Sequence, residues 1–258
     1  DRLVSFEQDT DHEAHHLVEE FMLLANEAAS RALTHAGLSQ LHRSHAAPET
    51  ARLAEATATL AAGGIEVEPL APKGALARVL RQLAERDDSF VWTSTLLRAL
   101  PKAAYSVTES GHFGLAKEAY AHFTSPIRRY PDLVTHRLLK GLLRKAGQIP
   151  SDDELEAVAT HCSERETISQ RAERHLLDIK LLRRLESDVR AAAPGQAFEG
   201  LVVAVYPNGC QIYLTAYRVM GWLPNVRAQN PPVPGQEVDV VPCQIDVTRG
   251  DLELAMRP

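Results

Sequence analysis

The segment from residue 151 to residue 193 contains neither glycine nor proline, the two residues that most often end helices. It therefore predicts one long helix, or two that are nearly continuous. Pro194 and Gly195 then break the pattern, and the composition changes to short runs of β-branched, aromatic or alternating residues separated by turn residues. These runs lie at 198–205, 210–214, 220–223, 237–243 and 251–256. The sequence predicts an α+β fold, with a mainly helical part over residues 1–193 and a small five-stranded β-barrel over residues 195–258.

Helical spacing and end signals predict further helices in the first part of the chain. The first spans about residues 10–36, with Gly37 as its stop. Others are predicted from residue 48 to the Gly63-Gly64 pair and over 73–86, 89–100 and 115–123. The Ser125-Pro126 pair predicts the start of another helix.

The composition excludes several classes of protein. With 45% hydrophobic residues and no apolar run near the length of a membrane span, no membrane partner is expected. The three cysteines form no C-x-x-C pair, which argues against zinc and favours reduced thiols in the cytoplasm. The net charge of −6 argues against general affinity for nucleic acid, so any RNA contact must come from a local cluster of cations.

Such a cluster lies between Ser125 and Lys145. It opens with Ser125, Pro126, Arg128 and Arg129, where a turn before a helix would aim backbone N–H groups and two guanidinium groups at one anionic point. This pattern indicates phosphate binding. The alternative is that the arginines form ordinary surface ion pairs.

The longer string around this turn resembles the ribonuclease II / ribonuclease R (RNB) family of exoribonucleases. The resemblance rests on GHFGLA at 111–116, AYAHFTSPIRRYPDL at 119–133 and HR at 136–137. Two further segments agree with it, HLVEEFMLLAN at 16–26 and QRAER at 170–174. The resemblance implies hydrolysis of single-stranded RNA from its 3′ end with release of nucleoside monophosphates, supported by magnesium ions.

The resemblance also implies roles for individual residues. Arg128 and Glu173 are expected to be catalytic, Arg128 on the scissile phosphate and Glu173 beside the terminal nucleotide. Glu173 could instead form an ion pair within its own helix. The residues expected to bind RNA in this part of the chain are Arg129, Glu19, Ser125 and Tyr130.

The aspartate cluster that holds magnesium in the family would lie upstream of this sequence. We therefore expect the chain to be the C-terminal portion of a longer enzyme, to act as a monomer with the N-terminal remainder of that enzyme, and to be inactive alone. Two alternatives stay open. One is a noncatalytic RNA-binding or regulatory module of the same fold, and the other is an unrelated helical scaffold whose barrel binds proteins or DNA.

The glycine spacing after residue 195 resembles the S1 type of OB-fold RNA-binding domain. Such domains bind single strands by stacking bases on aromatic side chains, for which Tyr206, Tyr213 and Trp222 are the candidates. By alternation some of these must fill the barrel, and Trp222 could lie in the core or on the surface. Few cations accompany them, so the barrel is expected to guide the strand rather than to bind it tightly.

A cluster of aspartate and histidine residues near the start of the chain could be interpreted as a metal site. Asp11 with His15 and His12 with His16 are four residues apart and would share one helical turn, with Asp9 close by. Helix starts attract aspartate, however, and exposed histidine is ordinary. We expect no metal ligand in the chain, and a structural role for His112.

Overall fold

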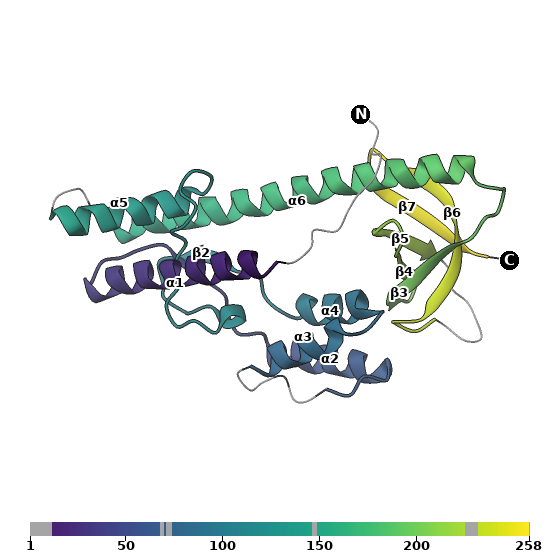
Figure 1. The fold of residues 1–258 in the computed structure, drawn as a ribbon, viewed down its shortest axis with the longest axis horizontal. Helices are drawn as coiled ribbons and strands as arrows, with labels where there is room; N and C mark the ends of the chain where they lie inside the picture. Colours follow the sequence, from purple (N-terminus) through teal and green to yellow (C-terminus); the bar gives the residue numbers. More distant parts are fainter. Residues whose placement is uncertain (1–11, 68–69, 71–73, 146–148, 225–231, 258) are drawn as a thin grey trace. The chain divides into compact units, whose positions relative to one another are not determined.

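The structure is a computed structural model that describes residues 12–67, 70, 74–145, 149–224 and 232–257. It contains two compact units. Unit 1 comprises Glu49–Leu100 with Arg171–Pro258, and unit 2 comprises the described part of Glu7–Pro48 with Pro101–Gln170. Helix α6 (Asp152–Ala191) contributes residues to both units (Figure 1). It runs for 40 residues without a break, which confirms the long helix predicted from the absence of glycine and proline.

Unit 1 contains the β-barrel. Its strands are β3 (Phe198–Tyr206), β4 (Gly209–Leu214), β5 (Val219–Pro224), β6 (Glu237–Asp246) and β7 (Asp251–Met256). They close in the order β3-β4-β5-β7-β6, with every pair antiparallel except β5 with β7. This order and closure are those of an OB-like barrel, so the predicted strands and α+β fold class are confirmed.

The barrel encloses alternate residues of its strands, among them Ile212 and Leu254. Helix α6 adds Leu181, Leu182 and Leu185 to the same core. Because apolar burial is the main source of folding free energy, this end of α6 and the barrel depend on each other for stability.

Three helices complete unit 1, namely α2 (Thr50–Ala62), α3 (Ala75–Ala84) and α4 (Ser89–Arg98), at the positions expected from the sequence. Trp92 of α4 is the largest fully buried side chain of their core, which also takes in Leu201 and Val203 of β3. The indole N–H donates to Asp88 Oδ2 at 2.6 Å. The helices therefore pack on the outer face of the barrel at β3.

Unit 2 contains α1 (Glu13–His35), β1 (His42–Ser44), β2 (Ala104–Ser106), the short 3₁₀ helix η1 (Phe113–Leu115), α5 (Tyr130–Arg144) and the first part of α6. Strands β1 and β2 form an antiparallel pair. Leu33 of α1, Leu41, Leu138 of α5 and Leu155 of α6 share one core. The described part of the first predicted helix is confirmed, while Thr10 and Asp11 lie outside the described residues.

Two boundaries in unit 2 differ from prediction. The helix predicted over 115–123 is wrong, because Ala116 takes a left-handed conformation (φ 53°) and no helix follows it up to residue 123. Tyr120 O instead accepts from Arg43 N at 2.8 Å. The next helix starts at Tyr130 and not at the Ser125-Pro126 pair, with Pro131 in its first turn. Both differences follow from contacts with β1 and α5 that local sequence does not reveal.

None of the described helices combines the length and the apolar character needed to cross a membrane.

Candidate phosphate-binding turn and barrel surface

The turn from Ser125 to Asp132 is held by one buried carboxylate. Asp132, in the first turn of α5, is fully buried, and its Oδ1 accepts from Ser125 N and from Arg129 Nη2, each at 2.7 Å. Ser125 O in turn accepts from the backbone N–H groups of Arg128 and Arg129 at 3.2 and 3.0 Å. A charge-assisted bond at each end of the turn fixes the path of the chain between them.

The two adjacent arginines therefore face different surroundings. The guanidinium of Arg129 is 22% exposed and paired with Asp132, whereas Arg128 is exposed and its side chain forms no ion pair with any described residue. Ile127 and Tyr130 on either side of it are also exposed, and Arg137 lies over the Tyr130 ring at 6.0 Å. Only Arg128 is thus presented by this turn as a guanidinium available to an anion.

Asn26 of α1 fixes the segment that leads into the turn. Its Oδ1 accepts from the backbone N–H groups of Phe123 and Thr124 at 2.9 and 3.2 Å, and its Nδ2 donates to the Tyr120 hydroxyl at 2.9 Å. Asn26 is buried, at 3% exposure, which is unusual for an amide inside a helix. Sequence reasoning gave Asn26 no role, because its burial, which requires hydrogen-bond partners, cannot be read from the sequence.

A network of aromatic and charged side chains contacts His122, in the segment that leads into the turn. Arg43 of β1 forms a two-point ion pair with Glu166 of α6, at 2.6 and 3.1 Å, and lies over the Tyr105 ring at 4.8 Å. The Tyr105 hydroxyl is hydrogen-bonded to His122 Nδ1 at 2.8 Å. Burial raises the pKa of Tyr105 to about 12. Burial, together with the positive charges of Arg129 and Arg43, lowers the pKa of His122 to about 3.

His122 is therefore neutral at pH 7 and adds no positive charge to the turn. The same holds for His112, whose pKa is lowered to about 4 by burial and by His45. His112 Nδ1 accepts from Leu115 N, and His45 Nδ1 accepts from Gly114 N, so both rings hold the loop around η1. These contacts support the structural role expected for His112.

The two predicted carboxylates lie on exposed helix faces. Glu19 on α1 is exposed, with its Oε2 4.0 Å from His16 Nδ1. Glu173 on α6 is exposed and belongs to unit 1, whereas Glu19 and Arg128 belong to unit 2. The structure thus describes the local surroundings of both carboxylates, and no hydrogen bond or ion pair among the described residues joins Glu19 to the arginine turn of its own unit.

The three aromatic residues of the barrel that are predicted to stack on bases differ in their surroundings. Tyr213 on β4 is stacked on Phe90 of α4, with ring centroids 3.9 Å apart and planes inclined by 16°. Trp222 on β5 is half-buried on the outer face of the barrel, with Tyr206 5.9 Å away and half-exposed. Trp222 rather than Tyr213 therefore has a surface available for a ligand, and the open choice between core and surface for Trp222 is settled in favour of the surface.

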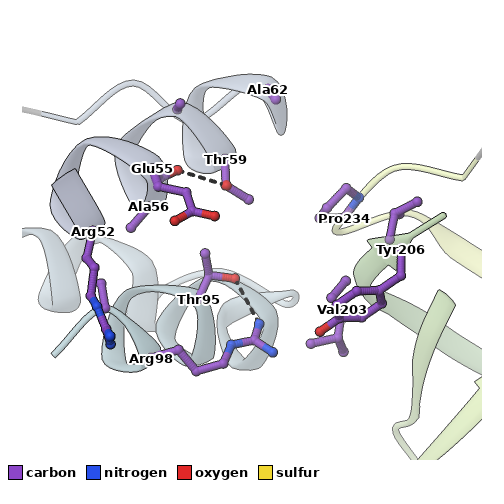
Figure 2. Close-up of a pocket in the computed structure, with 14 residues that line it drawn as sticks. Arg52, Glu55, Ala56, Thr59, Ala62, Thr95, Arg98, Val203, Tyr206 and Pro234 are labelled. Carbon is purple, nitrogen blue, oxygen red and sulfur yellow. Dashed lines mark hydrogen bonds between the residues drawn. The ribbon is translucent and has the colours of Figure 1, made fainter. Parts of the chain in front are cut away.

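A cleft of about 690 Å³ within unit 1 lies between α2, α4 and β3. Figure 2 shows Arg52 and Arg98 on its helical side and Tyr206 with Pro234 on its barrel side. Arg98 Nη2 donates to Thr95 Oγ1 at 3.4 Å. The cleft combines two guanidinium groups and the carboxylate of Glu55 with an aromatic side chain.

The described residues contain no cluster suited to holding a magnesium ion. Within the described residues, no group of three or more histidine, cysteine, aspartate or glutamate side chains is placed to hold a metal ion. Asp9 and Asp11 of the alternative cluster lie outside the described residues. We therefore assign no catalytic step to a metal ion held by the described residues.

Comparison with known proteins places this geometry in a family. A profile of the RNB domain matches residues 1–145, which include the whole arginine turn. The chain belongs to the RNB family. It is 35% identical over 218 residues to ribonuclease R of Escherichia coli, covering 79% of this chain and 26% of that protein. The chain thus spans about a quarter of the length of this relative, and the predicted family resemblance is confirmed.

Solved structures share the fold. Mycoplasma genitalium RNase R, as the apo form and in complex with ribose-methylated single-stranded RNA, matches with a TM-score of 0.84 at 23% identity, covering 96% of this chain and 42% of that one. Yeast Ssd1, described as a pseudonuclease, matches with a TM-score of 0.69 at 20% identity over 86% of this chain and 28% of that one. The same fold therefore occurs both in a ribonuclease and in a protein described as a pseudonuclease.

Proposed function

We propose that the protein containing this chain is a 3′-to-5′ hydrolytic exoribonuclease that acts on single-stranded RNA and releases nucleoside monophosphates. The observation that carries the proposal is the arginine turn. In a chain of the RNB family, the Ser125–Asp132 turn directs to solvent one guanidinium, Arg128, that no described carboxylate pairs with, and holds its neighbour, Arg129, against a buried aspartate.

Arg128 is suited to stabilise a phosphate as its charge grows. Its planar fork can donate two parallel hydrogen bonds to phosphate oxygens, which the point charge of a lysine cannot do. The backbone around it is already fixed by the Asp132 and Ser125 bonds, so little reorganisation is needed when the transition state forms. Arg128 would therefore act mainly on the rate of the chemical step.

Arg129 would support Arg128. Its ion pair with Asp132 ties the end of the turn to α5, and its charge still contributes to the local potential felt by a phosphate. The bond to Asp132 uses one nitrogen of the guanidinium, so the remaining N–H groups could also contact a neighbouring phosphate. We favour the supporting role, because the Arg129 side chain is only 22% exposed.

The other proposed contacts are more peripheral. Glu173 would accept hydrogen bonds from the terminal nucleotide, Glu19 and Ser125 would contact the strand near the turn, and exposed Tyr130 would stack on a base. Trp222 would guide the strand on the barrel. Magnesium would be held by residues of the complete protein other than the described ones, and would supply the activation of water.

The second candidate is a noncatalytic RNA-binding or regulatory protein of the same fold. The likeness to yeast Ssd1 favours it, because the fold alone does not distinguish a nuclease from a pseudonuclease. Under this candidate Arg128 would still bind phosphate, but no RNA would be shortened.

The test is a time course with the complete protein, magnesium and a single-stranded RNA labelled at its 5′ end. The proposal predicts 5′-labelled products that shorten progressively from the 3′ end, with nucleoside monophosphates in solution. DNA of the same sequence serves as the control and should persist. RNA that is bound but remains intact would favour the noncatalytic candidate, and internal cleavage would contradict the proposed direction of degradation.

A further inference from the structure

Four polar or aromatic side chains form one row across the outer face of the barrel. The strand registers place Gln211 of β4 beside Trp222 of β5, Trp222 beside Glu253 of β7, and Glu253 beside Gln244 of β6. Directly paired residues of neighbouring strands project from the same face of a sheet. We refer to these four residues as the Trp222 row.

The burial pattern shows that this face is the outer one. Gln211, Trp222 and Glu253 are each flanked along their strands by buried residues, including Ile212, Leu223, Leu252 and Leu254. Glu253 and Gln244 are exposed, and Gln211 and Trp222 are half-buried. All four line a groove of about 380 Å³, within the size range of small-molecule sites.

The charges around the groove do not suit the backbone of RNA. Asp246, Asp251 and Glu253 contribute three carboxylates, against one cation, Arg249. Arg249 already lies 3.7 Å from Asp246, whose Oδ1 also accepts from the Thr248 and Arg249 N–H groups. A groove with excess negative charge repels phosphates, so a ligand that enters it must present a base and keep its phosphate outside.

The row has the chemistry to read the edge of such a base. A base stacked on Trp222 would meet the Gln211 amide on one side and the Glu253 carboxylate on the other. A carboxylate only accepts hydrogen bonds, and Glu253 forms no ion pair within the described part of the chain that would occupy its oxygens. Cytosine, adenine and guanine each offer an exocyclic amino group to such an acceptor. Uracil offers only an imino N–H between two carbonyl oxygens, which the carboxylate would repel.

We propose that the Trp222 row is a base-selective subsite that favours RNA bases with an exocyclic amino group and disfavours uracil, with Trp222 as the stacking platform and Glu253 as the discriminating acceptor. The inference rests on the proposed action on single-stranded RNA, and it names the base preference at one subsite. Tyr206 beside Trp222 provides a second stacking surface for an adjacent base.

The test is equilibrium binding of the complete protein, without magnesium, to short oligocytidylate, oligoadenylate and oligouridylate of equal length. We expect roughly tenfold tighter binding of the cytidylate than of the uridylate, the scale of one good base contact. Glu253→Gln should bring this ratio to within about twofold, chiefly by improving uridylate binding, because a glutamine amide can donate to the uracil carbonyls. Trp222→Ala should weaken all three by roughly tenfold.

Glu199→Gln is the matched control, since Glu199 is an exposed carboxylate on β3 that does not line the groove. It should leave the cytidylate-to-uridylate ratio unchanged. An equal ratio in the unaltered protein, or a ratio that Glu253→Gln does not change, would overturn the inference. The assay measures binding only, so it separates the subsite from the proposed activity. If the protein shortens RNA but shows no base preference, the subsite alone is refuted. If it shows the base preference but does not shorten RNA, the proposed activity alone is refuted.

Discussion

Arg128 and Arg129 are adjacent in sequence, yet their replacement should have very unequal consequences for stability. Arg129→Ala leaves the fully buried Asp132 carboxylate with one hydrogen-bond donor among the described residues, the Ser125 N–H. Removing one member of a buried ion pair costs about 3–5 kcal/mol. The lower end applies here, because Arg129 is 22% exposed and the pair is joined through a single carboxylate oxygen, with Asp132 Oδ2 lacking a partner among the described residues. Arg128→Ala, at an exposed side chain, should change stability by no more than about 0.5 kcal/mol.

Hydrogen–deuterium exchange of the peptide covering residues 119–133 in the complete protein measures this difference locally. A loss of about 3 kcal/mol corresponds to roughly a hundredfold larger opening constant for the amides of Ser125, Arg128 and Arg129. Arg129→Ala and Asp132→Ala should each produce this effect, and the double variant should add little to either. The reasoning is refuted if Arg128→Ala and Arg129→Ala accelerate exchange equally, or if the effects of Arg129→Ala and Asp132→Ala simply add.

Three further predictions concern pH, metal and the barrel. Two buried histidines, His122 and His112, should make stability depend on pH. The folded side chains have pKa values of about 3 and 4 and stay neutral, whereas the unfolded ones take up protons below about pH 6.5. The free energy of unfolding should therefore be fully retained above about pH 6.5 and fall toward pH 4, by up to about 1.4 kcal/mol per pH unit for each histidine, and constant thermal unfolding midpoints across this range would contradict the account. The chain alone should release no nucleoside monophosphates from RNA even in excess magnesium, because its described residues present no group of three potential metal ligands. Metal-dependent release of nucleotides by the chain alone would disprove this. Deletion of residues 195–258 from the complete protein should weaken RNA binding and lower the slope of log affinity against log salt concentration by roughly 0.7 per lost phosphate contact. Because Leu181 and Leu182 of α6 lie in the barrel core, the stability of the shortened protein must be measured as a control. Unchanged RNA binding would exclude the barrel as an RNA guide.

Regular elements of this fold could be predicted because their signals are local. The absence of glycine and proline from 151–193 predicts α6, and strict alternation predicts β4 and β7. The segment 115–123 could not be predicted, because its conformation is set by pairing with residues around His45 and Arg43, far away in the sequence.

The surroundings of the candidate site residues likewise depend on contacts that are distant in the sequence. The motif identified the Arg128–Arg129 pair, and Asp132 stands three residues after Arg129, but only the burial of Asp132 decides which guanidinium turns inward. Likewise Tyr213 and Trp222 are equivalent by alternation, and it is the stacking of Phe90, more than a hundred residues earlier, that removes Tyr213 from the available surface. Asn26 lay within a matched segment but acquired a role only through its contacts with the segment leading into the turn.

The most direct test of the central claim separates chemistry from binding at Arg128 in the complete protein. Single-turnover cleavage rates and equilibrium RNA affinities should be measured for Arg128→Ala, Arg128→Lys and the unaltered protein. Loss of one preorganised donor to a developing charge predicts a rate roughly 10²–10³-fold lower for Arg128→Ala with a much smaller change in affinity, and only partial recovery with lysine. A folded Arg128→Ala protein that cleaves RNA at a near-normal rate would contradict the claim that this turn presents Arg128 to the scissile phosphate.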